Sequence, residues 1–287
     1  MRLRTAVLDG HDLACVSLPD GRLARIDRLL PDPPADLLGL LESDRLAELG
    51  AALDDVPERA LVDGGAPSGP PLRRPQKVLG IGLNYGEHAG DLGEQAPRTS
   101  PASFLKAPHT ICGPGDPIEV PQGIGKVTAE AELGLVFGRE CYRVGVEEAM
   151  SYVAAVVAVL DQTAEAVLLE NPRYLTRVKN YPTFFAFGPE LVTLDEVLAS
   201  GPLETLRVAT VLGGEVHRED TVAGMTFSPA ELVSFHSHVM PFYPGDVLST
   251  GTPGAVGITH GDVVRCELGG GDRPLLSSLT NPVVAGR

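Results

Sequence analysis

The residues of this sequence that could do chemistry together begin with two glutamates, Glu130 and Glu132, inside the apolar stretch 128–137. If this stretch is a β-strand, side chains alternate between its faces, so both carboxylates share one face and the large apolar residues share the other. Two like charges this close are unfavourable unless they are solvated or neutralised by a cation. One interpretation is a half-exposed strand with solvated glutamates, and the alternative is a metal site.

A third carboxylate favours the metal site. The β-branched run 153–160 stops at Asp161, which is typical of a buried strand that delivers an acid at its end. Three oxygen donors that leave positions open for water and substrate indicate Mg²⁺ or Mn²⁺, with Ca²⁺ as an alternative, and they do not suit a zinc site of thiolates or imidazoles. We therefore predict a divalent-metal site formed by Glu130, Glu132 and Asp161.

A histidine lies in a segment that could cover such a site. The stretch that follows the expected strand 77–83 is polar and rich in glycine up to Pro97, which suits a mobile lid. His88 and Asp91 are three residues apart in it, so on one helical turn the carboxylate can orient the imidazole. A histidine held beside a metal-bound substrate is suited to act as general base for a water molecule, and the alternative is an exposed histidine on a loop.

In the order and spacing of its motifs, the sequence resembles the fumarylacetoacetate hydrolase family over about residues 75–280. The motifs that carry the resemblance are Gly-Leu-Asn-Tyr at 82–85 with His88, Phe-x-Lys at 104–106, Glu-x-Glu-Leu at 130–133, Asp161, Lys179 with Gly-Pro at 188–189, Pro-Gly-Asp at 244–246 and Thr-Gly-Thr-Pro at 250–253. The resemblance implies an α+β, strand-rich fold, a mixed β-sandwich roll or pseudo-barrel with a small N-terminal α+β domain.

The same resemblance implies roles for individual residues. Lys179 would act in the site, where its ammonium group holds a substrate carboxylate or enolate oxygen. Lys106 would be a supporting charge close to the substrate, and a solvated surface lysine is the alternative. Tyr85 and Thr252 would contact the substrate, the threonine through its hydroxyl or backbone amide.

One segment departs from the family. Where relatives usually carry Asp-x-Thr-Ala-Arg-Asp, residues 161–166 read Asp-Gln-Thr-Ala-Glu-Ala, so Glu165 replaces an arginine that grips a substrate carboxylate. Leu168 replaces a glutamine in the same way. If the segment is helical, Glu165 lies on the same side as Asp161 and adds negative charge to the substrate site. A less anionic or differently oriented substrate would follow.

These residues together predict a metal-dependent hydrolase that cleaves a carbon-carbon bond of a β-diketo or acylpyruvate-type acid through a metal-stabilised enolate. The same site could instead serve a decarboxylase or an isomerase of a 2-keto acid. The replacements at Glu165 and Leu168 keep a third alternative open, a non-catalytic binding scaffold. By family analogy we expect a homodimer.

Composition excludes several other classes. The chain has 287 residues and a net charge of −15, which argues against nucleic acid or an anionic membrane as a partner. No apolar run is long enough to span a bilayer, and the start of the sequence lacks a secretory signal pattern. The four cysteines have no Cys-x-x-Cys spacing, so a reduced cytoplasm is the expected location.

The domain organisation is predicted from breaker residues and short patterns. A Gly/Pro-rich segment, 64–71, separates residues 1–72 from a catalytic domain at 73–287. The first part should contain a hairpin around Asp9 and Gly10 and a helix over 43–53 with Ser43 as N-cap. A second helix should begin with the capping box Ser-Pro-Ala-Glu at 228–231. Three residues at helical spacing would then pack in the core, namely Leu232, Phe235 and Val239.

Overall fold

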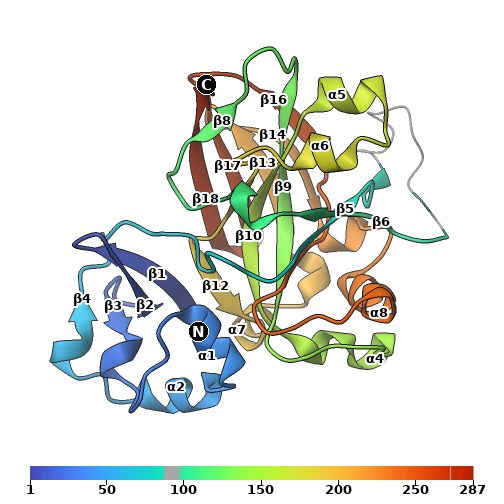
Figure 1. The fold of residues 1–287 in the computed structure, drawn as a ribbon. Helices are drawn as coiled ribbons and strands as arrows, with labels where there is room; N and C mark the ends of the chain where they lie inside the picture. The colour runs from blue at the N-terminus through green and yellow to red at the C-terminus, as the bar shows by residue number, and fades with distance from the viewer. Residues whose placement is uncertain (87–96, 98, 272, 287) are drawn as a thin grey trace.

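The computed structural model describes residues 1–86, 97, 99–271 and 273–286 (Figure 1). The helices are α1 (Leu37–Glu42), α2 (Leu46–Ala52), α4 (Val146–Ala149), α5 (Glu165–Glu170), α6 (Leu175–Lys179), α7 (Leu194–Ala199) and α8 (Pro229–Val239). The strands are β1 (Arg2–Leu8), β2 (His11–Ser17), β3 (Leu23–Arg25), β4 (Leu61–Val62), β5 (Val78–Gly82), β6 (Ala102–Lys106), β7 (Ile111–Cys112), β8 (Ile118–Val120), β9 (Val127–Phe137), β10 (Val153–Thr163), β11 (Phe185–Phe187), β12 (Glu190–Thr193), β13 (Arg207–Leu212), β14 (Glu215–Thr221), β15 (Val247–Ser249), β16 (Ala255–Ile258), β17 (Val263–Gly270) and β18 (Arg273–Ala285).

These strands form two sheets. The larger sheet has thirteen strands, and its main path runs β4-β3-β2-β1-β12-β10-β9-β15-β5-β6, with β7, β11 and β16 attached beside it. The smaller sheet has five strands in the order β14-β13-β17-β18-β8. Among the strands that the structure describes, the path of the larger sheet ends at β4 and β6 without closing into a barrel. The predicted strand-rich α+β class is confirmed.

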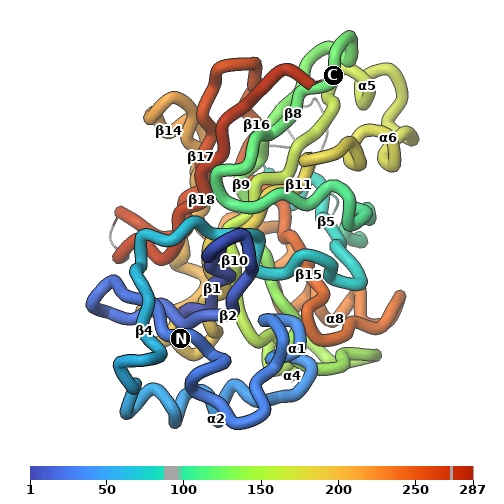
Figure 2. Tube along the Cα trace, turned by 60° about the vertical axis from the view of Figure 1, so that its left-hand side comes forward, coloured from blue at the N-terminus to red at the C-terminus, as the bar shows by residue number. Residues whose placement is uncertain are grey.

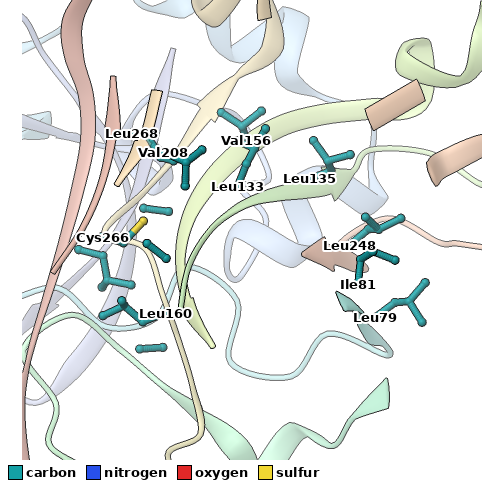
Figure 3. Packing of buried hydrophobic residues seen from close by; sticks show 14 of the residues in the cluster. Leu79, Ile81, Leu133, Leu135, Val156, Leu160, Val208, Leu248, Cys266 and Leu268 are labelled. Carbon is teal, nitrogen blue, oxygen red and sulfur yellow. The ribbon is translucent and has the colours of Figure 1, made fainter. Parts of the chain in front are cut away.

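The main core lies between the two sheets. Leu133 and Leu160 from the larger sheet belong to one buried cluster with Val208 and Leu268 from the smaller sheet (Figure 3). All eleven residues of β9 are buried. Because successive side chains of a strand alternate, the face of β9 that supplies this cluster is apolar, and the two glutamates lie on the opposite face.

The N-terminal strands extend the larger sheet. β1 and β2 form the predicted hairpin, in which Leu8 pairs with His11. Asp9 and Gly10 have φ angles of 51° and 76°, as the two central residues of a tight hairpin turn require. β1 also pairs with β12, and both views show the N-terminal segment at the opposite end of the molecule from the C-terminus (Figures 1 and 2). The domain boundary at residue 72 stays a prediction.

The helix start predicted at Ser43 is wrong. Ser43 lies at the end of α1, where its hydroxyl donates to the carbonyl oxygen of Gly39 at 2.7 Å. Asp36 caps the start of this helix by accepting a hydrogen bond from the Gly39 amide at 2.8 Å. A serine hydroxyl can satisfy a free amide at one helix end or a free carbonyl at the other, so the residue type alone does not decide which end it occupies.

The helix α8 begins as predicted but turns a different face inward. Ser228 and Glu231 form the predicted capping box. Leu232 is fully buried, whereas Phe235 is 41% exposed and Val239 is 62% exposed, so their assignment to the core is wrong. His236 is buried instead, and its Nδ1 lies 2.8 Å from the carbonyl oxygen of Leu232. The backbone partner satisfies one ring nitrogen of the imidazole, while Nε2 is buried without a partner among the described residues. The inner face of α8 is therefore turned away from the phenylalanine.

The strands beside β9 bring the remaining site segments together. β15 and β16 both pair with β9 on the same edge, and the loop between them spans residues 250–254. β5 lies parallel to β15 and antiparallel to β6, so the end of β5 and the start of β6 lie on the side of this loop. No helix among the described residues is long and apolar enough to cross a membrane.

Candidate metal centre

Three carboxylates meet on one face of the central strand pair. Glu130 and Glu132 come from β9, and Asp161 of β10 stands directly opposite Glu130 in the antiparallel register. One carboxylate oxygen of each residue lies within 4.8 Å of the others. The three side chains are buried, with 7%, 1% and 1% of their surfaces exposed. Strand alternation thus brings together the three residues that the sequence singled out.

Glu130 is bound by a threonine and a lysine. Its Oε1 accepts from the hydroxyl of Thr163 at 2.8 Å and lies 3.4 Å from that of Thr128. Its Oε2 accepts from the ammonium group of Lys179 at 2.9 Å. Each oxygen of this carboxylate therefore has a different kind of donor.

Glu132 is bound from the neighbouring strand. Its Oε2 accepts from the hydroxyl of Ser249 and from the backbone amide of Gly251 at 3.1 Å. Burial, together with the charge of Asp161, raises the pKa of Glu132 to about 8. A nearby cation would restore the charged form of this carboxylate.

Asp161 lies between two lysines from different elements. Its Oδ1 accepts from the ammonium group of Lys106, at the end of β6, and its Oδ2 accepts from that of Lys179, in α6, at 2.6 Å. Both lysines are buried, so the alternative of a solvated surface Lys106 is wrong. Burial lowers the pKa of Lys106 to about 8. Burial also acts to lower the pKa of Lys179, but Asp161 and Glu130 outweigh it and raise that pKa above its usual range.

The charges of this cluster suit a divalent ion. Three carboxylates and two ammonium groups give a formal charge of −1 when all five are ionised, in a place from which water is largely excluded. The ligand atoms are all carboxylate oxygens, the type that Mg²⁺ and Mn²⁺ prefer. The residues present therefore fit the metal that the sequence predicts.

The predicted substrate contacts Tyr85 and Thr252 are also buried. Tyr85 is 1% exposed, and its hydroxyl has no hydrogen-bond partner among the described residues. Burial raises the pKa of this phenol, and the charges of Asp220 and Glu132 act in the same direction. The hydroxyl of Thr252 donates to the carbonyl oxygen of Gly254 at 3.1 Å. His88 and Asp91 lie outside the described residues.

Glu165 does not share a helix face with Asp161. β10 continues to Thr163, and α5 begins only at Glu165, so the four-residue helical spacing does not apply. Its carboxylate forms an ion pair of 2.5 Å with Lys126, a side chain that is 61% exposed. The premise that Glu165 adds its charge to the same side as Asp161 is therefore wrong, while its contact with substrate stays a prediction.

Sequence reasoning missed the donors that hold the carboxylates. Thr163 stands two residues after Asp161 on the same strand face, and Ser249 directly precedes the Thr-Gly-Thr-Pro segment. Asn84 was also missed as a support: its amide donates to the carbonyl oxygen of Thr250 at 2.9 Å and to that of Phe227 at 3.0 Å. Thr163 could have been predicted from the sequence, because it is a polar residue two positions from a candidate ligand and so lies on the same strand face.

Comparison with known sequences settles the family. The profile described as fumarylacetoacetate (FAA) hydrolase C-terminal matches residues 77–284, which includes all three carboxylates and both lysines. The chain belongs to the fumarylacetoacetate hydrolase family. A Burkholderia multivorans family relative, named provisionally as a hydrolase, is 35% identical over 239 residues, which is 83% of this chain and 82% of its own length.

Two solved structures are similar to this family member over the full length of both chains. Maleylpyruvate hydrolase from Sphingobium sp. SYK-6, in complex with manganese(II) and pyruvate, has 26% identity and a TM-score of 0.79, with 100% of each chain covered. The 5-carboxymethyl-2-hydroxymuconate delta-isomerase from Mycobacterium smegmatis has 26% identity and a TM-score of 0.76, again with 100% of each chain covered. Similar structures thus include a hydrolase and an isomerase.

Proposed function

We propose that this protein is a metal-dependent hydrolase that cleaves a carbon-carbon bond of an acylpyruvate or related β-diketo acid. The observation that carries the proposal is the cluster of three carboxylate oxygens within 4.8 Å of one another, with Lys179 bound to two of the carboxylates. The similar Sphingobium hydrolase, whose structure contains manganese(II) and pyruvate, supports the same reaction class.

Glu130, Glu132 and Asp161 would hold Mg²⁺ or Mn²⁺. The ion, when bound, would polarise a substrate carbonyl and offset the negative charge that develops as the bond breaks. These three residues would supply only carboxylate oxygens, the ligand type that Mg²⁺ and Mn²⁺ prefer. The proposed ion is therefore Mg²⁺ or Mn²⁺, with Ca²⁺ the less suitable candidate.

The chain's own residues would position the substrate and move its protons. Lys179 would donate to a substrate oxygen that gains charge, and Tyr85 and Thr252 would orient the substrate. His88, oriented by Asp91, would take a proton from water. The water oxygen adds to a carbonyl carbon, and the adjacent carbon-carbon bond breaks with its electron pair on the leaving carbon. A proton then reaches that carbon, which gives a carboxylic acid and a keto acid.

A second candidate function is isomerisation of a 2-keto acid, because a delta-isomerase has similar structure over the whole chain. It would use the same ligands and Lys179 but no attack by water, so a proton would move from one carbon to another. Decarboxylation on the same ligands would release carbon dioxide. Analysis of products separates the three reactions: a new carboxylate indicates hydrolysis, carbon dioxide indicates decarboxylation, and a product of unchanged mass indicates isomerisation.

The first experiment is calorimetric titration of chelator-treated protein with Mn²⁺ and Mg²⁺, with and without oxalate as a mimic of the enolate. We expect one ion per chain and oxalate binding only when the metal is present. Acylpyruvates would then be screened for release of pyruvate. Glu132→Ala and His88→Ala should both abolish turnover, and unchanged turnover in both variants overturns the proposed mechanism.

We further propose that the protein is a cytoplasmic homodimer. The four cysteines are free and buried, in keeping with a reducing compartment. Light scattering coupled to gel filtration measures the mass in solution, and a monomer mass close to the 30.2 kDa of one chain would contradict the dimer.

A further inference from the structure

The three carboxylates share one pattern of hydrogen bonding to the surrounding protein. In each of them the protein binds one particular oxygen with a donor of its own. Thr163 donates to Oε1 of Glu130, Ser249 and the Gly251 amide donate to Oε2 of Glu132, and Lys106 donates to Oδ1 of Asp161. One oxygen of each carboxylate is thus engaged by the surrounding strands and loops.

The other oxygens of two carboxylates face a common point. Oε2 of Glu130 and Oδ2 of Asp161 lie 2.9 Å and 2.6 Å from the same atom, Nζ of Lys179. The oxygens that do not accept from Thr163 or Lys106 therefore already bind a cation, the ammonium group of Lys179. In both Glu130 and Asp161, one oxygen faces the cation position that Lys179 occupies, and the other is bound by a separate donor.

Lys106 has little freedom to move away from Asp161. Its side chain is fully buried. An ammonium group has three N–H donors, and each has an acceptor here: Oδ1 of Asp161, the Phe184 carbonyl oxygen at 2.5 Å and the Gln162 carbonyl oxygen at 3.3 Å. Rotation of the ammonium group away from Asp161 would leave buried polar groups without partners, which is unfavourable.

The number of oxygens that a carboxylate offers separates divalent ions. Ca²⁺ takes six to eight oxygen ligands and commonly binds a carboxylate through both oxygens, whereas Mg²⁺ requires an octahedron of six. We infer that Lys106 is a positioning residue that restricts Asp161 to one ligand oxygen and so makes the site prefer Mg²⁺ and Mn²⁺ over Ca²⁺. The inference rests on the metal site of the proposed function and adds how the chain selects its ion.

The test compares the affinities of two ions in the same variant. Lys106→Met removes the ammonium group but keeps an unbranched side chain. Loss of a positive charge strengthens the binding of every divalent ion, so the ratio of the Mn²⁺ and Ca²⁺ dissociation constants, measured by calorimetry, isolates the effect of geometry. We expect this ratio to move toward Ca²⁺ by about 10-fold or more, the size of effect that partners of metal ligands usually have.

Two further variants make the result interpretable. Thr163→Val removes the closer of the two threonine hydroxyls at Oε1 of Glu130 without changing charge and should shift the ratio in the same direction, so the inference stays testable if Lys106→Met does not fold. Lys77→Met removes a lysine that is ion-paired with Asp246, outside the three carboxylates, and should leave the ratio unchanged.

The outcomes separate this inference from the proposed function. Wild-type protein that binds neither ion overturns the metal site itself, and with it both proposals. Wild-type protein that binds Mn²⁺, with a ratio changed by less than about threefold in both Lys106→Met and Thr163→Val, overturns the positioning role alone.

Discussion

The ammonium nitrogen of Lys179 lies 2.6 Å from Oδ2 of Asp161, although the lysine ends the helix α6 and the aspartate belongs to the strand β10. The same nitrogen lies 2.9 Å from a carboxylate oxygen of Glu130. Lys179 thus binds two of the three candidate metal ligands, and its charge competes with a divalent ion for their oxygens. In the proposed mechanism it would also donate to a substrate oxygen that gains negative charge.

Replacement of this lysine should separate metal binding from catalysis. In Lys179→Met we expect Mn²⁺ to bind at least as tightly as in the wild type, because a competing cation is gone, while kcat falls by about 10²–10³, as for loss of one donor to a charged transition state. Calorimetry and steady-state kinetics measure the two quantities. Arg177→Met, on the same helix but exposed, is the control and should change neither. Loss of Mn²⁺ binding in Lys179→Met would show that the lysine is needed to assemble the ligands.

Gly251 should be required both for the backbone conformation of its loop and for metal binding. Its φ angle is +92°, and a Cβ atom there would lie 2.9 Å from Cβ of Asn84. Its amide also donates to Glu132. We expect Gly251→Ala to lower the free energy of unfolding by about 1–3 kcal/mol and to weaken Mn²⁺ binding by about 10-fold or more.

A second glycine provides the matched control for this substitution. Gly261 has a similar φ angle of +96°, but among the described residues no heavy atom beyond its own and its chain neighbours' lies within 4 Å of the position a Cβ would take. Gly261→Ala should therefore lower the stability through backbone strain and leave Mn²⁺ affinity unchanged. Denaturant unfolding and calorimetry measure both variants, and equal Mn²⁺ affinities in the two would remove Gly251 from the metal site.

The sequence was sufficient for the parts of the site that follow from local rules. Alternation along one strand predicts Glu130 and Glu132 on one face, and the apolar run before Asp161 predicts a buried strand that carries this acid, although β10 continues two residues beyond it to Thr163. The burial of Lys106 did not follow from such rules. Its acceptors, Asp161 and the Phe184 carbonyl oxygen, are distant in sequence, and a single lysine in a strand carries no pattern that shows which way it points.

Two errors have the same origin in distant contacts. Glu165 shares a side with Asp161 only if the segment 161–165 is helical, and the pairing of β10 with β9 keeps the strand extended to Thr163 instead. The partner of Glu165 is Lys126, which stands just before β9. On α8, helical spacing pointed to Phe235 as a core residue, while the hydrogen bond of a buried His236 defines a different inner face. Sequence periodicity predicts the helix or strand, but contacts with distant residues determine which of its faces is buried.

The position of Glu165 leads to a specific expectation about its charge. Because its carboxylate is paired with the exposed side chain of Lys126, outside the three-carboxylate cluster, Glu165→Ala should change the Mn²⁺ dissociation constant by no more than about twofold. Glu130→Ala, which removes a ligand, should abolish detectable binding under the same conditions. Weakening of Mn²⁺ binding by an order of magnitude in Glu165→Ala would show that its negative charge does act on the site.

The buried Glu132 should give the metal-free protein an unusual dependence of stability on pH. Its pKa is raised to about 8 in the folded state, mainly by burial, against a reference value of 4.5. The folded state therefore holds a proton that the unfolded chain releases between these values, so the free energy of unfolding should fall as pH rises from about 4.5 to about 8. Lys106, with a pKa lowered to about 8, makes its own contribution only above this window.

Three measurements of thermal unfolding across this pH range test the assignment. Metal-free wild type should lose stability as pH rises, and Glu132→Gln, which cannot ionise, should show a much flatter profile. Saturating Mn²⁺ should flatten the wild-type profile, because the ion binds the deprotonated carboxylate and its affinity rises with pH as the stability of the metal-free protein falls. Parallel profiles for metal-free wild type and Glu132→Gln would mean that another group titrates in this window and that Glu132 is ionised even without a metal.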